Sequence, residues 1–280
     1  MKLGYSTWGM PKVPIDSALA HLAGLGFEGV ELTVIPGYTT ELRTLDAAAR
    51  RRIRDLYREY GLDLPAIAAH TTFLEADAER HRANVDRLAG AIDLAVDLAQ
   101  GPTPPAIDTT LGGRPDQWEE VRARLVERVG EVVRRAASKG VTIALEPHVG
   151  ASVDRPDRVL WLLQQVNSPY LKLNFDISHF DVVGLGLEET VPVMAPHAVH
   201  THVKDQRGRA PRHDFLIPGE GAFDYVRYLK AMEQAGYGGY ITVEVSVMVQ
   251  RRPNYDPYAA ADLSYKTLSE AFERAGIKRG

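Results

Sequence analysis

The sequence predicts a single (β/α)8 barrel, of the TIM-barrel type, over residues 1–280. Three observations favour this fold over an open, doubly wound sheet. Short apolar runs alternate eight times with segments of helical periodicity, and no break in composition divides the chain. The length of 280 residues is close to the roughly 250 residues of a typical barrel of this kind. The first apolar run also lacks the glycine-rich turn of a dinucleotide-binding fold.

The expected strands and helices follow each other along the chain. Strands are expected at residues 2–6, 29–32, 64–70, 106–108, 142–146, 171–176, 198–204 and 240–244. Helices are expected at 16–25, 46–60, a long segment that ends at 98, 116–139, 156–166, 187–195, 225–235, and a last segment that ends near 275. Apolar residues recur along the helical segments with a period of 3.6, and several of these segments stop at a glycine. Residues 205–224 show no such pattern, so we expect a loop over one end of the barrel.

The composition restricts the classes of partner. With 45% hydrophobic and 25% charged residues, the chain resembles an ordinary globular protein. Its formal charge of −4 provides no electrostatic attraction to nucleic acid or to an anionic membrane. The absence of cysteine excludes disulfides, thiolate ligands and cysteine nucleophiles. The sequence shows neither a signal-peptide pattern nor an apolar run of about 20 residues, so we expect a cytoplasmic protein that acts on a small molecule.

Four of the expected strands end in a carboxylate or an imidazole just before a loop. These residues are Glu146, Asp176, His202 and Glu244. In a barrel of this kind the carboxyl ends of the strands form the active-site face. Any one of the four could instead cap a helix or form a surface ion pair, but three converging carboxylates without a cation would repel one another. They predict a divalent-metal site, with a donor set that suits Mn²⁺ or Mg²⁺ and also accepts Co²⁺ or Zn²⁺.

Three further histidines lie near the same strand ends, and each has a structural alternative. His179 follows the second predicted ligand by three residues and could contact substrate or cap the next helix. His70 and His148 could line the pocket or satisfy buried carbonyl groups. We predict that all three bind substrate, and that His179 also takes part in catalysis.

Residues on the later strands and loops extend the predicted pocket. His200 shares one face of its strand with His202, so we expect it to support that ligand as a hydrogen-bonded neighbour. A basic cluster follows the same strand and could bind oxygen-rich substrate groups, close a lid, or lie in solvent: Lys204, Arg207, Arg209 and Arg212. Lys204 and Arg207 are predicted as substrate-binding residues. Trp8 ends the first strand and could form an apolar wall, although an aromatic ring there could equally serve packing alone.

Five short motifs occur along nearly the whole chain in a recognisable order and spacing. They are Leu145-Glu146-Pro147, Phe175-Asp176-Ile177-Ser178-His179, His202-Val203-Lys204-Asp205, Pro218-Gly219-Glu220-Gly221 and Val243-Glu244. Together they resemble the sugar phosphate isomerase/epimerase superfamily, also called xylose isomerase-like barrels. This superfamily includes ketose 3-epimerases, hydroxypyruvate isomerases, inosose dehydratases and the endonuclease IV group.

The resemblance implies roles for the residues in these motifs. The four predicted ligands would bind one Mn²⁺-like ion, while His179 and an arginine of the loop after the seventh strand would contact substrate. In the epimerase branch Glu146 and Glu244 would exchange the substrate proton from opposite faces. A metal ion that holds the oxygens of a keto-sugar acidifies the adjacent C–H, and a nearby carboxylate can remove that proton. We therefore predict an isomerase or epimerase of carbohydrate metabolism.

The same chemistry leaves other activities open. Expulsion of a β-leaving group would make the protein a lyase, such as an inosose-type dehydratase. Residues 204–221 and 249–255 are similar to the catalytic subunits of C-glycoside deglycosidases, which cleave 3-oxo-glucosides and usually work with a small partner subunit. Without such a partner we expect a homo-oligomer. An endonuclease IV-like nuclease is disfavoured, because that group uses a histidine where this chain has Asp108, and a barrel that only binds a sugar is the non-enzymatic alternative.

Overall fold

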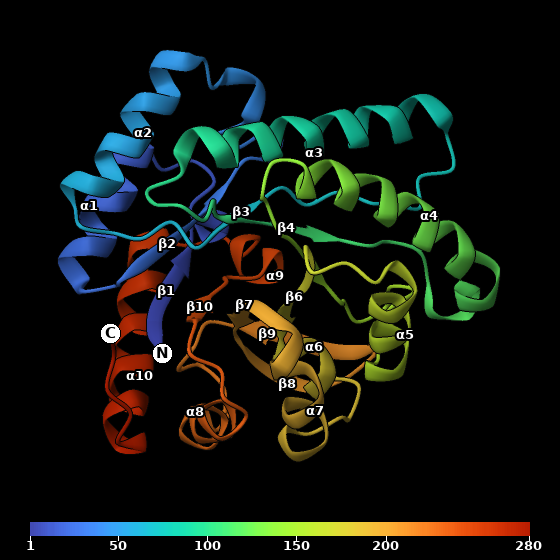
Figure 1. The fold of residues 1–280 in the computed structure, drawn as a ribbon. Coiled ribbons are helices and arrows are strands. Elements are labelled where there is room, and N and C mark those ends of the chain that lie inside the picture. The colour runs from blue at the N-terminus through green and yellow to red at the C-terminus, as the bar shows by residue number, and fades with distance from the viewer.

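The computed structural model describes residues 1–280 and contains a closed barrel of eight parallel strands, with helices around its outside (Figure 1). Around the barrel the strands run in the order β1, β2, β3, β4, β5, β6, β7, β10, and β10 pairs with β1 to close the ring. This topology confirms the predicted (β/α)8 barrel. None of the helices combines the length and the hydropathy that a membrane crossing requires.

The observed elements agree closely with the expected ones. The strands are β1 Lys2–Ser6, β2 Gly29–Thr33, β3 Ala66–Ala68, β4 Ala106–Thr110, β5 Ile143–Glu146, β6 Leu171–Asp176, β7 Ala198–Val203, β8 Asp205–Arg209, β9 Arg212–Leu216 and β10 Tyr240–Val243. The helices are α1 Ile15–Leu25, α2 Ala47–Glu59, α3 Ala78–Leu98, α4 Trp118–Ala137, α5 Pro156–Val166, α6 Ile177–Asp181, α7 Leu187–Met194, α8 Tyr225–Gln234, α9 Val247–Gln250 and α10 Pro257–Ala275. The short helices α6 and α9 were not predicted.

The segment 205–224 is not the loop that the sequence predicts. Strands β8 and β9 form an antiparallel hairpin there, with Asp205 opposite Leu216 and Arg209 opposite Arg212. Most of the hairpin side chains are charged or exposed, so the strands lack the apolar alternation by which a half-buried strand is recognised. Backbone pairing holds the two strands together, and a cross-strand ion pair between Arg207 and Asp214 supports it.

The barrel strands divide their side chains between two environments, because successive residues of a strand point to opposite faces. A core of 67 buried apolar residues packs between the strands and the surrounding helices. Ala66, Ala106 and Ala144 form a separate small cluster on three neighbouring strands. Polar side chains occupy other positions of the interior: Glu31 on β2 contacts His202 on β7, although β1 and β10 lie between these strands. Contacts of this kind can only cross the inside of the barrel.

Candidate active site at the carboxyl end of the barrel

The structure brings together the four residues that the sequence predicts as metal ligands. Glu146, Asp176, His202 and Glu244 come from the ends of β5, β6, β7 and β10, and one donor atom from each lies within 4.8 Å of all the others. The first three are 0% exposed and Glu244 is 4% exposed. The predicted strand ends therefore do converge on one buried cluster.

A helix cap fixes the carboxylate of Asp176. This residue ends β6 and is the N-cap of α6, where its Oδ1 accepts hydrogen bonds from the backbone N–H of Ser178 at 2.9 Å and from its hydroxyl at 2.6 Å. With Oδ1 held in this way, Oδ2 points toward the ammonium group of Lys204. The cap thus leaves one oxygen of Asp176 available to the cluster.

Lys204 lies inside the cluster as a counter-ion. Its ammonium group donates to Asp176 Oδ2 and to Glu244 Oε2, and the residue is 1% exposed. Burial alone would lower its pKa, but these two carboxylates outweigh burial and raise the pKa above the usual lysine value. The ammonium also lies 5.4 Å from the centre of the Phe215 ring. One fixed positive charge therefore faces three carboxylates.

The two nitrogens of His202 face different partners. Nδ1 lies 3.1 Å from Glu146 Oε1, 3.9 Å from Glu244 Oε1 and 3.0 Å from the side-chain nitrogen of Asn174. Nε2 lies 3.1 Å from both carboxylate oxygens of Glu31. Burial would lower the pKa of His202, but the surrounding carboxylates, Glu31 first among them, raise it well above the usual value. A cation at the cluster would therefore compete with the proton on Nδ1.

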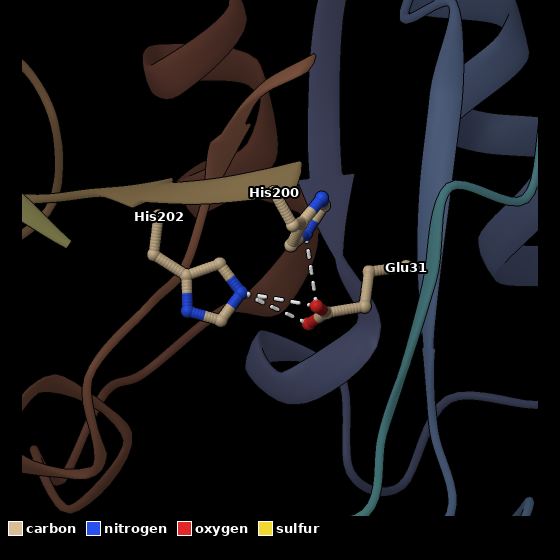
Figure 2. A group of neighbouring side chains, drawn as sticks. All are labelled: Glu31, His200 and His202. Carbon is tan, nitrogen blue, oxygen red and sulfur yellow. Dashed lines mark hydrogen bonds and ion pairs between the residues drawn. The ribbon is translucent and has the colours of Figure 1, made fainter. Parts of the chain in front are cut away.

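Glu31 is a buried carboxylate of β2 that the sequence reasoning missed. Figure 2 shows the interactions of His200 and His202 converging on its carboxylate, and the Nε2 atoms of the two rings lie 3.0 and 3.1 Å from its Oε2. The hydroxyl of Ser6 donates to Oε1 at 2.5 Å. Burial would raise the pKa of Glu31, but the two imidazoles outweigh burial and hold the pKa well below the usual range. His200 thus lies where the sequence places it, beside the ligand position rather than within the four-residue cluster.

His70 and Asp108 form a hydrogen-bonded pair on one side of the site. His70 Nε2 lies 2.7 Å from Asp108 Oδ2 and 3.7 Å from Glu146 Oε2. Burial would lower the pKa of His70, but the Asp108 carboxylate raises it to about 9. The Trp8 ring stacks on His70 with centroids 4.7 Å apart, and Tyr38 packs on Trp8 at 5.6 Å. Asp108 was not predicted as a site residue, whereas Trp8 and His70 lie where a pocket wall is expected.

His148 and His179 form a second wall. Their ring centroids are 3.7 Å apart, and His148 Nε2 lies 3.3 Å from Glu146 Oε2. His179 Nε2 lies 3.6 Å from Asp176 Oδ2, and the ring packs against Phe215 at 5.1 Å. Burial holds the pKa of His179 well below the usual histidine value, so its imidazole is neutral and both nitrogens are without a hydrogen-bond partner. A substrate oxygen could supply the missing partner.

Arg207 lies away from the cluster. It is on β8, its side chain is 71% exposed, and it pairs with Asp214 of β9 at 3.0 Å. The neighbouring Arg209 pairs with Asp181 at 3.2 Å. Arg207 and Arg209 are therefore held in ion pairs near the surface, and the structure does not bring Arg207 to the buried carboxylates.

The carboxylate of Asp205 explains the glycine-rich motif that follows the hairpin. Its Oδ2 accepts hydrogen bonds from the backbone N–H groups of Gly219 at 2.7 Å and Gly221 at 2.8 Å. A Cβ atom on Gly221 would lie 2.9 Å from Cγ of Asp205, and Gly219 has a φ of +103°. Both positions therefore favour glycine, and the motif anchors the hairpin beside Lys204.

The donor chemistry of the four-residue cluster fits a hard divalent cation. Three carboxylates and one imidazole supply the oxygen and nitrogen ligands that such ions prefer. Glu146 Oε2 is buried and lies 3.3 Å from His148 Nε2 and 3.7 Å from His70 Nε2, so imidazoles are its nearest charge partners. Without a metal ion, the ammonium group of Lys204 and the proton on His202 balance part of this negative charge. A divalent ion would replace that proton and balance the three carboxylates together with Lys204.

Comparisons with known proteins agree with this architecture. A family model described as "Xylose isomerase-like TIM barrel" matches residues 19–268. Fructoselysine 3-epimerase of Shigella flexneri is 25% identical over 274 residues, which cover 90% of this chain and 93% of that protein. Inosose dehydratase of Geobacillus thermodenitrificans is 25% identical over 272 residues, covering 86% and 87%. A solved structure of IOLI protein with a binding zinc atom superposes with a TM-score of 0.78 at 19% identity, over 98% of both chains.

Proposed function

The chain belongs to the xylose isomerase-like TIM barrel family, and from this premise we propose that it is a metal-dependent enzyme that removes a proton beside the carbonyl group of a sugar or keto-sugar. The observation that carries this proposal is the convergence of Glu146, Asp176, His202 and Glu244 in one buried cluster. Relatives of the chain include a sugar epimerase and an inosose dehydratase, which supports enzymatic activity of the isomerase, epimerase or lyase type. The predicted homo-oligomer and cytoplasmic location stay predictions.

We propose that the same four residues hold one divalent ion. A bound divalent ion would polarise the substrate carbonyl and stabilise negative charge on its oxygen. Zinc is the metal named for one structural neighbour, whereas the oxygen-rich donor set also suits Mn²⁺, the metal predicted from the sequence. The assignment to Mn²⁺ depends on this donor chemistry alone.

Residues of the chain would transfer the proton and bind the substrate. Glu146, whose Oε2 faces the His148 and His70 imidazoles, would take the substrate proton, and Glu244 would return it from the other side. The neutral His179 imidazole would bind a substrate oxygen, and the Trp8 ring beside His70 would pack on the apolar face of the sugar. Lys204 would hold Glu244 in place through its contact with Oε2.

Return of the proton to the opposite face of the same carbon gives an epimerase, and its return to the neighbouring carbon gives an isomerase. We favour these two outcomes, because two carboxylates of one cluster can serve as base and acid in turn. A lyase that acts on 3-oxo-glucosides or inososes is the second candidate, and the 25% identity to inosose dehydratase over most of the chain supports it. The likeness to C-glycoside deglycosidases, with their small partner subunit, stays a prediction.

Deuterium exchange tests the proposed chemistry. We expect metal-loaded protein in D₂O to label one carbon of a ketose, inosose or 3-oxo-glycoside, measured by NMR and mass spectrometry. Deuterium in an intact carbon skeleton indicates an isomerase or epimerase, whereas released water or aglycone indicates a lyase. Protein stripped of metal with a chelator is the control and should exchange nothing. A metal-loaded enzyme that exchanges no C–H in any of the three compound classes would contradict proton abstraction.

Asp176→Asn should lower the metal content. The amide loses the negative charge that Asp176 Oδ2 presents to the cluster, so we expect at least a tenfold loss of affinity for Zn²⁺ or Mn²⁺, measured by titration and elemental analysis. Asp181→Asn is the matched control, since Asp181 pairs with Arg209 outside the cluster. Equal metal occupancy in both variants would mean that Asp176 is not a ligand.

A further inference from the structure

In a polar layer next to the cluster, one carboxylate faces the hydroxyl of Ser6 and the imidazoles of His200 and His202. Glu31 on β2 faces His200 and His202 across the barrel interior (Figure 2). Ser6 on β1 donates its hydroxyl to Oε1 of Glu31. All four residues are 0% exposed. The arrangement of this layer therefore determines where protons lie on the imidazoles that it contacts.

We propose that Glu31 is a positioning residue that holds His202 with its proton on Nε2, so that the lone pair of Nδ1 faces the carboxylates of the predicted metal site. Nε2 of His202 lies 3.1 Å from both oxygens of Glu31, and in this geometry the imidazole is the donor and the carboxylate the acceptor. Nδ1 faces Glu146 Oε1 at the same distance, but a cation held by Glu146 would displace a proton from that side only. A neutral imidazole has a single N–H, and Nδ1 is then the free ligand atom. This inference rests on the proposed function, because it assumes that His202 binds the metal.

The contacts of Glu31 explain how it can hold His202 in one tautomer and one ring orientation. Metal-binding histidines commonly donate their second N–H to a carboxylate, which fixes the tautomer and the ring orientation. Here Glu31 is itself fixed, by Ser6 from β1 and by His200, which is two residues from His202 on the same strand. Rotation of the His202 ring would break its contacts with Glu31 on one side and with Glu146 on the other.

The same three residues Glu31, His200 and His202 could also be read as ligands of a second ion. Their partners favour positioning instead. The layer contains one carboxylate, whose oxygens already face a hydroxyl and two imidazoles. The four-residue cluster, in contrast, has three carboxylates, which face one ammonium group and the His202 imidazole. Only the four-residue cluster has negative charge left for a divalent ion to balance.

Zinc affinity provides the first test. We expect Glu31→Gln to bind Zn²⁺ about 10- to 100-fold more weakly than the wild type, measured by calorimetry with a competing chelator. Ser6→Ala should cause a smaller loss, and it should add nothing in the Glu31→Gln background, because both changes act through one contact. Glu59→Gln on the surface of α2 is the matched control and should leave the affinity unchanged.

The tautomer itself can be measured. In long-range ¹H–¹⁵N spectra of Zn²⁺-loaded protein, we expect His202, identified by the signal missing in His202→Gln, to show a protonated Nε2 and a metal-bound Nδ1. Glu31→Gln should lose this single pattern. The opposite tautomer in the wild type, or an unchanged zinc affinity in folded Glu31→Gln, would overturn the proposal. A second Zn²⁺ that the wild type binds and that Glu31→Gln alone loses would also overturn the proposal.

The outcomes separate this inference from the proposed function. Wild-type protein that binds no Zn²⁺ contradicts the metal site and with it the proposed function. Wild-type protein that binds Zn²⁺, with Glu31→Gln binding it equally well, contradicts only the role of Glu31. If circular dichroism shows that Glu31→Gln does not fold, Ser6→Ala decides the matter: weaker zinc binding supports the proposal, and unchanged binding overturns it.

Discussion

Glu146→Gln is expected to reduce kcat by about 10²- to 10⁴-fold at saturating metal, the contribution typical of a general base. Burial would raise the pKa of Glu146, but His148 and His202 outweigh burial and hold the pKa well below the usual range, so the side chain is ionised at neutral pH. Its Oε2 lies 3.3 Å from His148 Nε2, beside the wall that His148 and His179 form, and would take the substrate proton there. Glutamine has the same shape but cannot accept that proton.

Glu244→Gln should show a related defect that distinguishes two bases from one. If Glu146 and Glu244 act on opposite faces of the substrate, each single variant should still exchange deuterium into one epimer and should not convert it into the other. Both effects are measured by NMR in D₂O, with the metal content of each variant determined alongside. Glu220→Gln is the matched control, because Glu220 pairs with Arg252 at 2.8 Å outside the cluster. Full epimerisation by either active-site variant would remove the proton-transfer assignment.

The barrel and the four converging residues were predictable because both depend on local patterns. Short apolar runs and helical segments of period 3.6 alternate along the chain, and a carboxylate or imidazole at the end of a strand interrupts an otherwise apolar run. For β6 and α5 the predicted bounds match the structure. All strands of a closed parallel barrel run in the same direction, so their carboxyl ends lie on one face. This arrangement brings Glu146 and Glu244 together.

The missed residues depend on contacts between distant strands. Glu31 lies in the middle of β2, between Val30 and Leu32, and its partners are on β7. A carboxylate between two aliphatic residues of a strand was the available signal, because alternation turns that one side chain to the other face of the sheet. Asp108 follows Ile107 in the same way. Neither position shows, from sequence alone, that an imidazole on another strand would compensate the buried charge.

The sequence also suggested too large a role for the hairpin. Arg207 follows the seventh barrel strand closely enough to suggest a substrate contact, but its ion pair with Asp214 depends on the antiparallel pairing of β8 with β9. That pairing has no apolar signature, so neither the hairpin nor the exposed position of the arginine could be predicted. Lys204 is three residues earlier and points the other way, into the carboxylates. Lys204 and Arg207 are thus only three positions apart, yet one is a buried counter-ion and the other forms a surface ion pair.

Lys204→Met should destabilise the metal-free protein by about 3–5 kcal/mol, the cost of leaving buried charges without their partner. Lys204 is the ammonium group between Asp176 and Glu244, which would then repel each other in a site with almost no access to water. The free energy of unfolding is measured in urea with a chelator present. Lys139→Met is the matched control, because Lys139 forms a surface pair with Asp93 and such pairs contribute less than about 1 kcal/mol.

A divalent ion should reverse much of this defect. Metal at 100 times its dissociation constant stabilises a folded protein by about 2.7 kcal/mol, and the variant should bind metal at least as tightly as the wild type, because no ammonium competes for the carboxylates. We therefore expect metal to raise the stability of Lys204→Met more than that of the wild type. A variant as stable as the wild type without metal would show that Lys204 does not balance the cluster. An unstable variant that metal fails to rescue would show that these carboxylates do not hold a divalent ion.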